Sequence, residues 1–157
     1  MFRKILYPTD FSDCAAKALE YVKKLREAGT EEVVLVHVID VPDIETMDIG
    51  AAGLGMTTAE YEEALQKKMR DEAEKKLEAV KEELKSVGLK VSVKIPEGIP
   101  FKKILRIAED EDVSLIVLGS HGKSNIMEML LGSVSEGVIR GSKRPVLVIK
   151  RETTIMW

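Results

Sequence analysis

Residues 113–134 read VSLIVLGSHGKSNIMEMLLGSV. Five of the first six residues are apolar, and this composition and length predict a buried strand. The strand stops at Gly119, Gly122 follows, and Gly132 precedes a helical pattern that begins at Val134. Glycine lets backbone N–H groups approach a ligand closely and permits positive φ, so a buried strand that leads through glycines into a helix is typical of phosphate sites.

The connection between this strand and its helix is longer than the geometry of the turn requires. Strand–glycine–helix turns without a ligand are common in α/β proteins, but nine residues separate Gly122 from Gly132, which is not a minimal connection. Ser133, with Glu136 three residues later, has the pattern of an N-terminal capping box. We therefore expect a helix N-terminus with unpaired N–H groups beside Gly132 and Ser133.

The composition indicates one globular domain over residues 1–157, with 45% hydrophobic and 32% charged residues. A net charge of −3 offers no electrostatic case for nucleic acid, and no apolar run approaches the roughly 20 residues that span a membrane. The single cysteine, Cys14, excludes an internal disulfide and fits a reducing compartment. We expect a cytoplasmic protein.

Strand and helix patterns alternate along the chain. We predict strands over residues 5–7, 32–39, 90–95, 113–118 and 146–149, with helices that begin near Ser12, Thr57, Pro100 and Val134. This alternation predicts an α/β sandwich, a five-stranded parallel sheet with helices on both faces. It allows the strand order 3-2-1-4-5 or the flavodoxin-like order 2-1-3-4-5. We favour 3-2-1-4-5, which places a ligand-binding switch point between the first and fourth strands.

Residues 40–56 interrupt the alternation. The segment has no periodicity and contains Gly50, Gly53 and Gly55. A connection of this length in a compact domain is a lid, a contact surface or disorder. We expect a long flexible loop, disordered or in contact with a partner, with no part in catalysis.

Three other kinds of site do not fit the sequence. Gly122-Lys-Ser resembles a Walker A ending, but Val117 occupies the position where that motif needs glycine. His37 and His121 have no cysteine or carboxylate at metal-ligand spacing, which argues against zinc. Cys14 lies at a predicted helix start with no histidine near it in the sequence, which argues against a catalytic cysteine.

The pattern Gly119-x-x-Gly122-x9-Gly132-Ser133, together with Pro8-Thr9-Asp10 after the first strand, resembles the ATP-binding branch of the universal stress protein family. The resemblance extends from Lys4 to Val148. It implies a 3-2-1-4-5 sheet and a dimer.

The resemblance also implies roles for individual residues. Asp10 and the backbone of Pro8 and Thr9 would flank the adenosine, and the Val38 backbone would read the adenine edge. The phosphates and ribose would be surrounded by Gly119, Gly122, Gly132, Ser133 and Val134. His121 is either a phosphate contact or a hydrogen-bonding residue within its loop, and His37 is either a core residue or a ligand contact.

The function that follows is an ATP-binding stress-response protein with little or no hydrolysis. ATP is the expected ligand, with AMP or ADP as alternatives and Mg²⁺ carried by the phosphates. One rival is a slow ATPase or phosphotransfer enzyme that uses Asp10 and Mg²⁺. The other is a scaffold that acts through residues 40–56 on a protein partner not identified by the sequence. We also expect a homodimer through Val146–Ile149, because an apolar strand at a sheet edge invites pairing with a second chain.

Overall fold

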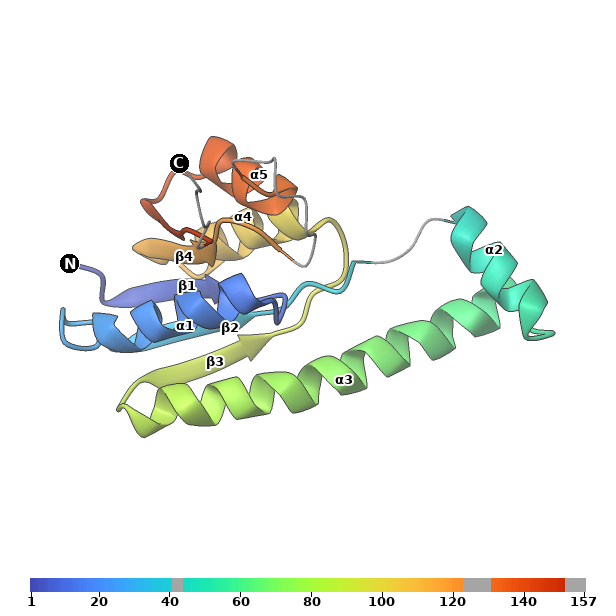
Figure 1. The fold of residues 1–157 in the computed structure, drawn as a ribbon, viewed down its shortest axis with the longest axis horizontal. Helices are drawn as coiled ribbons and strands as arrows, with labels where there is room; N and C mark the ends of the chain where they lie inside the picture. The colour runs from blue at the N-terminus through green and yellow to red at the C-terminus, as the bar shows by residue number, and fades with distance from the viewer. Residues whose placement is uncertain (41–43, 123–130, 152–157) are drawn as a thin grey trace, which may run out of the picture.

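The computed structural model describes residues 1–40, 44–122 and 131–151. In these ranges strands and helices alternate around one sheet (Figure 1). The strands are β1 (Lys4–Pro8), β2 (Glu32–Val36), β3 (Lys90–Lys94), β4 (Leu115–Gly119) and β5 (Val146–Ile149). The helices are α1 (Asp13–Leu25), α2 (Ile44–Gly53), α3 (Thr58–Ser86), α4 (Pro100–Asp110) and α5 (Ser133–Gly141).

The sheet has the order β3-β2-β1-β4-β5, and all its strands are parallel. This confirms the order 3-2-1-4-5 and excludes the flavodoxin-like alternative. The second strand ends at Val36, earlier than predicted, although Ile39 still forms a bridge with Glu97. The carboxyl ends of β1 and β4 lie side by side, so the chain leaves the sheet in opposite directions at this point.

Alternate residues of β1, β2, β4 and β5 serve two separate cores. On one face, Ile5 and Tyr7 of β1 pack with Leu77 and Leu84 of α3. On the other, Leu6 of β1 packs in a cluster that includes residues of α4 and α5. Because helices cover both faces of β1, β2 and β4, these strands are largely apolar, whereas the edge strand β3 alternates valine with lysine and serine.

The helix starts follow from local capping. The Ser12 hydroxyl accepts a hydrogen bond from the Ala15 N–H at the start of α1. Thr57 and Glu60 form the predicted capping box of α3, with both reciprocal hydrogen bonds present. Pro100 lies in the first turn of α4, where its missing N–H costs no hydrogen bond.

The expectation of an irregular loop over residues 40–56 is wrong for its larger part, because residues 44–53 form the helix α2. Met47 and Ala51 are buried, and Gly50 lies against the Tyr61 ring of α3. No helical period is visible because polar, small and apolar residues are interspersed around α2, and periodicity reports only a difference between faces. Residues 41–43 lie outside the described ranges, and the flexibility of the segment stays a prediction.

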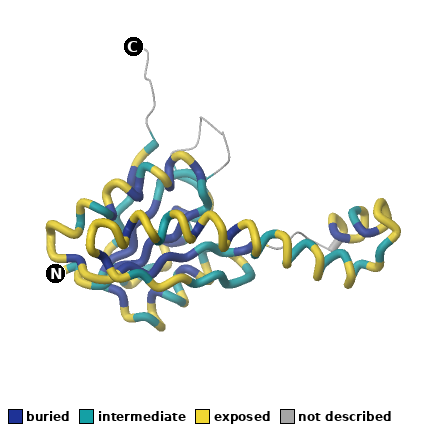
Figure 2. Tube along the Cα trace, turned by 90° about the horizontal axis from the view of Figure 1, so that it is seen from below, coloured by how far each residue is buried: buried dark blue, intermediate teal, exposed yellow. Residues whose placement is uncertain are grey.

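The long helix α3 has two different halves. The buried residues Ala73, Leu77 and Leu84 all lie in its C-terminal part, which packs on the sheet. Its N-terminal part extends beyond the sheet and carries α2 at its end (Figures 1 and 2). We call residues 44–68, which are α2 and the first turns of α3, the arm. Among the described residues, no helix is both long enough and apolar enough to cross a membrane.

Candidate functional site

A cleft of about 550 Å³ opens at the carboxyl ends of β1, β2 and β4 and at the N-terminus of α5. Every residue that the sequence indicated as a site residue lines this cleft: Pro8, Thr9, Asp10, Val38, Gly119, His121, Gly122, Gly132, Ser133 and Val134. These residues come from four segments that are distant in the sequence. The volume lies in the range of small-molecule and cofactor sites.

The turn after β1 holds Asp10 at the cleft. The Asp10 Oδ1 atom accepts a hydrogen bond of 3.0 Å from the Ser12 N–H, and the Thr9 hydroxyl accepts one from the Phe11 N–H. Phe11 takes a φ of 63°, in the left-handed region that few side chains other than glycine adopt. The turn therefore stores backbone strain, which its hydrogen bonds and the contact of the Phe11 ring with His37 offset.

His37 links the ends of β1 and β2. Its Nδ1 atom donates to the Thr9 carbonyl oxygen at 2.8 Å, which assigns the proton to Nδ1, and its ring lies 4.7 Å from that of Phe11. His37 is therefore hydrogen-bonded within the fold. It also lines the cleft, and its contact with a ligand stays a prediction.

The backbone of Val38 faces away from β3. His37 donates to the Lys94 carbonyl and Ile39 donates to the Pro96 carbonyl. Because successive residues of an extended chain point their N–H and C=O groups to opposite sides, the Val38 groups point to the cleft side. Within the described ranges no residue pairs with the Val38 N–H or C=O. An adjacent donor and acceptor of this kind match the edge of a nucleobase.

The motif needs glycine at these positions because neighbouring atoms lie too close to leave room for a Cβ. A Cβ at Gly119 would lie 2.9 Å from the Cys14 sulfur, and one at Gly122 would lie 2.6 Å from Asp10 Oδ2. A Cβ at Gly132 would lie 3.3 Å from the His121 Cα. The expectation of positive φ is wrong for these three glycines, because none of them has it.

Ser120, in the loop after β4, is almost fully buried and forms hydrogen bonds with Gly132 and Arg151. Its carbonyl accepts a 2.7 Å hydrogen bond from the Gly132 N–H, which closes the connection between the two glycine segments. Its hydroxyl accepts from the Arg151 N–H and lies 2.8 Å from His121 Nδ1. His121 therefore forms a hydrogen bond within its loop, which was one of the two roles expected for it. The other role, a phosphate contact through its second ring nitrogen, stays a prediction.

The N-terminus of α5 points into the cleft. Its N-cap is Gly132 rather than Ser133, because Ser133 already has helical geometry, and the predicted capping box is not formed. Within the described ranges, no group accepts a hydrogen bond from the N–H of Ser133, Val134 or Ser135. The Ser135 hydroxyl donates to the Gly119 carbonyl at 2.6 Å and so fixes the helix to β4. Unpaired N–H groups and the positive end of the helix dipole favour an anion here.

The ionisable groups of the cleft are few. Asp10, Asp40, His37 and His121 line it, and the described lining contains neither lysine nor arginine. Behind the lining, burial raises the pKa of Tyr7, whose hydroxyl donates to the Ala15 carbonyl at 2.6 Å. Tyr7 therefore stays a neutral hydrogen-bond donor that supports the start of α1. No group of three or more metal-ligating side chains occurs among the residues that the structure describes.

Several lining residues had no signal in the sequence. Met69 of α3, Pro100 and Ile104 of α4 and Asp40 also contact the cleft. Met69 belongs to the apolar stripe of a long helix, and such a stripe is indistinguishable from an ordinary core face until the crossing of α3 over the sheet is known. Met69, Pro100 and Ile104 make one side of the cleft apolar, which suits a flat aromatic ring.

Comparison with known proteins gives a consistent family. A sequence model of the universal stress protein family matches residues 1–150. Universal stress protein MJ0577 of Methanocaldococcus jannaschii is 50% identical over 159 aligned residues, covering 98% of each chain. Universal stress protein YxiE of Bacillus subtilis is 33% identical and covers 96% of this chain and 100% of its own.

Solved structures share the fold. The structure of MJ0577 superimposes with a TM-score of 0.85 at 47% identity and covers 98% of this chain and 99% of its own. A universal stress protein in complex with cAMP and one from Archaeoglobus fulgidus in complex with dAMP give TM-scores of 0.62 and 0.61 at 21% and 22% identity. They cover 95% and 96% of this chain, and 97% and 98% of their own. The family match over residues 1–150, joined by relatives that align along almost the whole chain, shows that this protein belongs to the universal stress protein family.

Proposed function

We propose that this protein binds an adenine nucleotide in the cleft at the carboxyl ends of β1 and β4, and that it acts as a cytoplasmic stress-response protein through binding rather than turnover. One observation carries the proposal. A single cleft brings together an unpaired backbone edge at Val38, a carboxylate at Asp10 and an open helix N-terminus at Ser133.

Each part of the cleft suits a different part of the nucleotide. The Val38 carbonyl accepts from the adenine amino group, and its N–H donates to the neighbouring ring nitrogen, with Met69 and Ile104 beside the base. Asp10 accepts from the ribose hydroxyls, flanked by Pro8 and Thr9. The phosphates lie against Gly119, Gly122 and Gly132 and against the N–H groups of Ser133 and Val134. Two proteins with this fold have been solved in complex with cAMP and dAMP, which supports the proposal that this fold binds adenine nucleotides.

The test is a comparison of two nucleotides by calorimetry. Guanine presents an oxygen where adenine presents its amino group, so it would face the Val38 carbonyl with a second acceptor. We expect one ATP site per chain and GTP affinity lower by about 5- to 150-fold, because an unpaired buried polar group costs about 1–3 kcal/mol. Equal affinities for ATP and GTP would contradict the assignment of Val38.

Slow or absent turnover is the second expectation. Phosphoryl transfer needs cations at the γ-phosphate and a group that positions the nucleophile. The described lining offers neither lysine nor arginine as the cation, and Asp10 is already engaged by the ribose, which leaves His121 as the group beside the phosphates. The rival ATPase would instead need Asp10 or Asp40 to hold Mg²⁺ at the phosphates. We expect ADP formation far below the median enzyme rate of about 10 per second. Multiple turnovers at such a rate, lost in Asp10→Asn, would instead support the rival ATPase.

We also propose a homodimer through β5. This strand is an edge of the sheet, and Val146, Leu147 and Val148 are only half-buried although they are apolar. An exposed apolar edge favours pairing with an antiparallel copy about a two-fold axis. Val148→Lys should therefore convert a dimer to a monomer in light scattering at micromolar concentration. A dimer mass for both proteins would exclude β5 as the interface, and a monomer mass for the wild type would exclude the dimer.

A further inference from the structure

The arm carries an apolar surface that the fold leaves uncovered. Met47 and Ala51 face α3 and are buried. Glu45 and Ile49 lie on the opposite side of α2 by helical spacing, and Ile49 is 69% exposed. Leu54, just after the helix, is 67% exposed. Large apolar side chains such as these are ordinarily buried, but α2 projects from the body (Figure 2).

The outer part of the arm carries charge of one sign, and the two lysines of the arm, Lys67 and Lys68, lie at its base next to the body. Residues 44–66 contain five acidic residues and neither lysine nor arginine. Glu45 and Glu63 are exposed, and within the described ranges neither forms an ion pair. Two arms would therefore repel each other, and the complement of this surface is one that is both apolar and basic.

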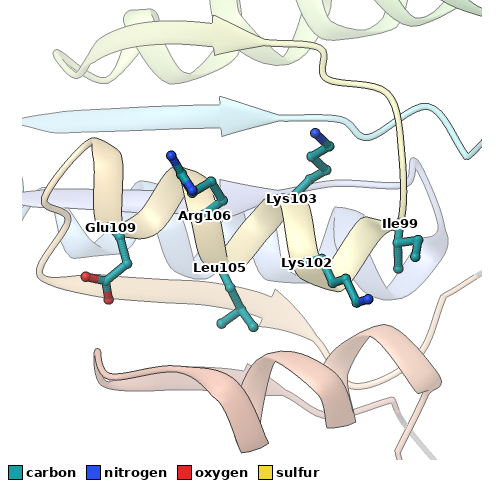
Figure 3. Close-up of a pocket in the computed structure, with 6 residues that line it drawn as sticks. All are labelled: Ile99, Lys102, Lys103, Leu105, Arg106 and Glu109. Carbon is teal, nitrogen blue, oxygen red and sulfur yellow. The ribbon is translucent and has the colours of Figure 1, made fainter.

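This chain has such a surface on α4. A shallow groove of about 560 Å³ is lined by six residues (Figure 3), of which one precedes α4 and five belong to it: Ile99, Lys102, Lys103, Leu105, Arg106 and Glu109. Ile99 is 51% exposed. Arg106 pairs with Asp110, but among the described residues no carboxylate pairs with Lys102 or Lys103. We call this surface the α4 groove.

The arm and the α4 groove of one chain cannot meet. The α3 helix, which carries the arm, packs on the face of the sheet that includes Leu77 and Leu84. The α4 helix packs on the opposite face through Ile104 and Ala108. Because α3 is continuous through its 29 residues, the arm has no hinge inside that helix that would return it to its own α4.

We propose that the arm of one chain docks in the α4 groove of a second copy of this chain. The apolar residues Ile49 and Leu54 contact Ile99 and Leu105 of the second copy. Glu45 and Glu63 face Lys102 and Lys103. If both copies exchange arms the contact is isologous and closed, and it is separate from the β5 edge, so the two interfaces together build a dimer of dimers.

Paired charge reversals test this proposal. One variant carries Glu45→Lys and Glu63→Lys on the arm, and the other carries Lys102→Glu and Lys103→Glu on α4. All four positions are exposed, so both variants keep the fold. Self-association is measured by sedimentation velocity over a range of concentrations, in the wild type and in a Val148→Lys background that removes the β5 edge as a source of association.

In the Val148→Lys background we expect concentration-dependent association that each reversal weakens by on the order of tenfold, since like charges now face each other. An equimolar mixture of the two variants should regain it, because every arm then meets a groove of opposite charge. A chain that carries all four substitutions should regain it alone.

A parent protein that does not associate, or reversals that leave association unchanged, would overturn the proposal. So would a mixture that associates no better than its components. If the parent protein does not associate, the acidic and apolar arm would instead fit a basic partner other than this chain.

Discussion

Gly122→Val should abolish ATP binding while leaving the protein folded. A Cβ at this position would lie 2.6 Å from Asp10 Oδ2, which is the end of a side chain and can swing aside at little cost to the fold. The branched γ carbons of valine would then occupy the space in which the glycines bring the backbone close to the phosphates. We expect a loss of affinity on the order of a hundredfold, which corresponds to about 3 kcal/mol, the upper end of the usual cost of overpacking.

The matched control is Gly53→Val. Gly53 also lacks positive φ, but a Cβ there meets nothing within 4 Å, and the residue lies at the end of α2, in the arm. Calorimetry should therefore find wild-type ATP affinity for this variant. Thermal unfolding of both variants shows whether the fold is kept. Unchanged ATP affinity in a folded Gly122→Val protein would contradict the assignment of the phosphates to this loop.

Leu84→Ala should destabilise the protein far more than Leu65→Ala, although both residues lie on the apolar stripe of α3. Leu84 is fully buried in the core beneath the sheet, and its truncation should lower the free energy of unfolding by about 2–5 kcal/mol. Leu65 is only half-buried and lies in the arm, so its truncation should cost less than about 1 kcal/mol in dilute solution.

Urea denaturation at low protein concentration measures this difference, because dilution removes any contribution of contacts between copies. A cost for Leu65→Ala equal to that for Leu84→Ala would mean that the N-terminal half of α3 is anchored as firmly as its C-terminal half. The distinction between arm and body would then fail, and with it the reason for expecting an uncovered surface on α2.

The fold was predictable because its signals are local. Apolar runs such as residues 113–118, caps such as Thr57 with Glu60, and Pro100 in a first turn each decide their own segment. The site was predictable because the parallel sheet places Asp10, Val38 and Gly119 at one end, so that a motif in each segment is enough to bring them into one cleft.

The remainder depended on contacts that no local pattern reports. The α2 helix lacked a helical period because polar, small and apolar residues are interspersed around it. The contact of Met69 with the cleft follows from where α3 crosses the sheet. Gly132, not Ser133, is the N-cap of α5, because the hydrogen bond from the Gly132 N–H to the Ser120 carbonyl sets where the helix begins. The three glycines line the cleft, and what requires glycine there is the closeness of Cys14, Asp10 and His121 rather than positive φ. Their contact with phosphates stays a prediction.

The central claim, an adenine nucleotide in this cleft with its base at Val38, is tested most directly by photolabelling with an azido-adenine analogue of ATP, followed by peptide mapping. The account predicts that the adduct lies in the peptide containing residues 36–40 or on Met69, and that excess ATP prevents it. Labelling that ATP does not prevent, or that lies outside the residues lining the cleft, would contradict it.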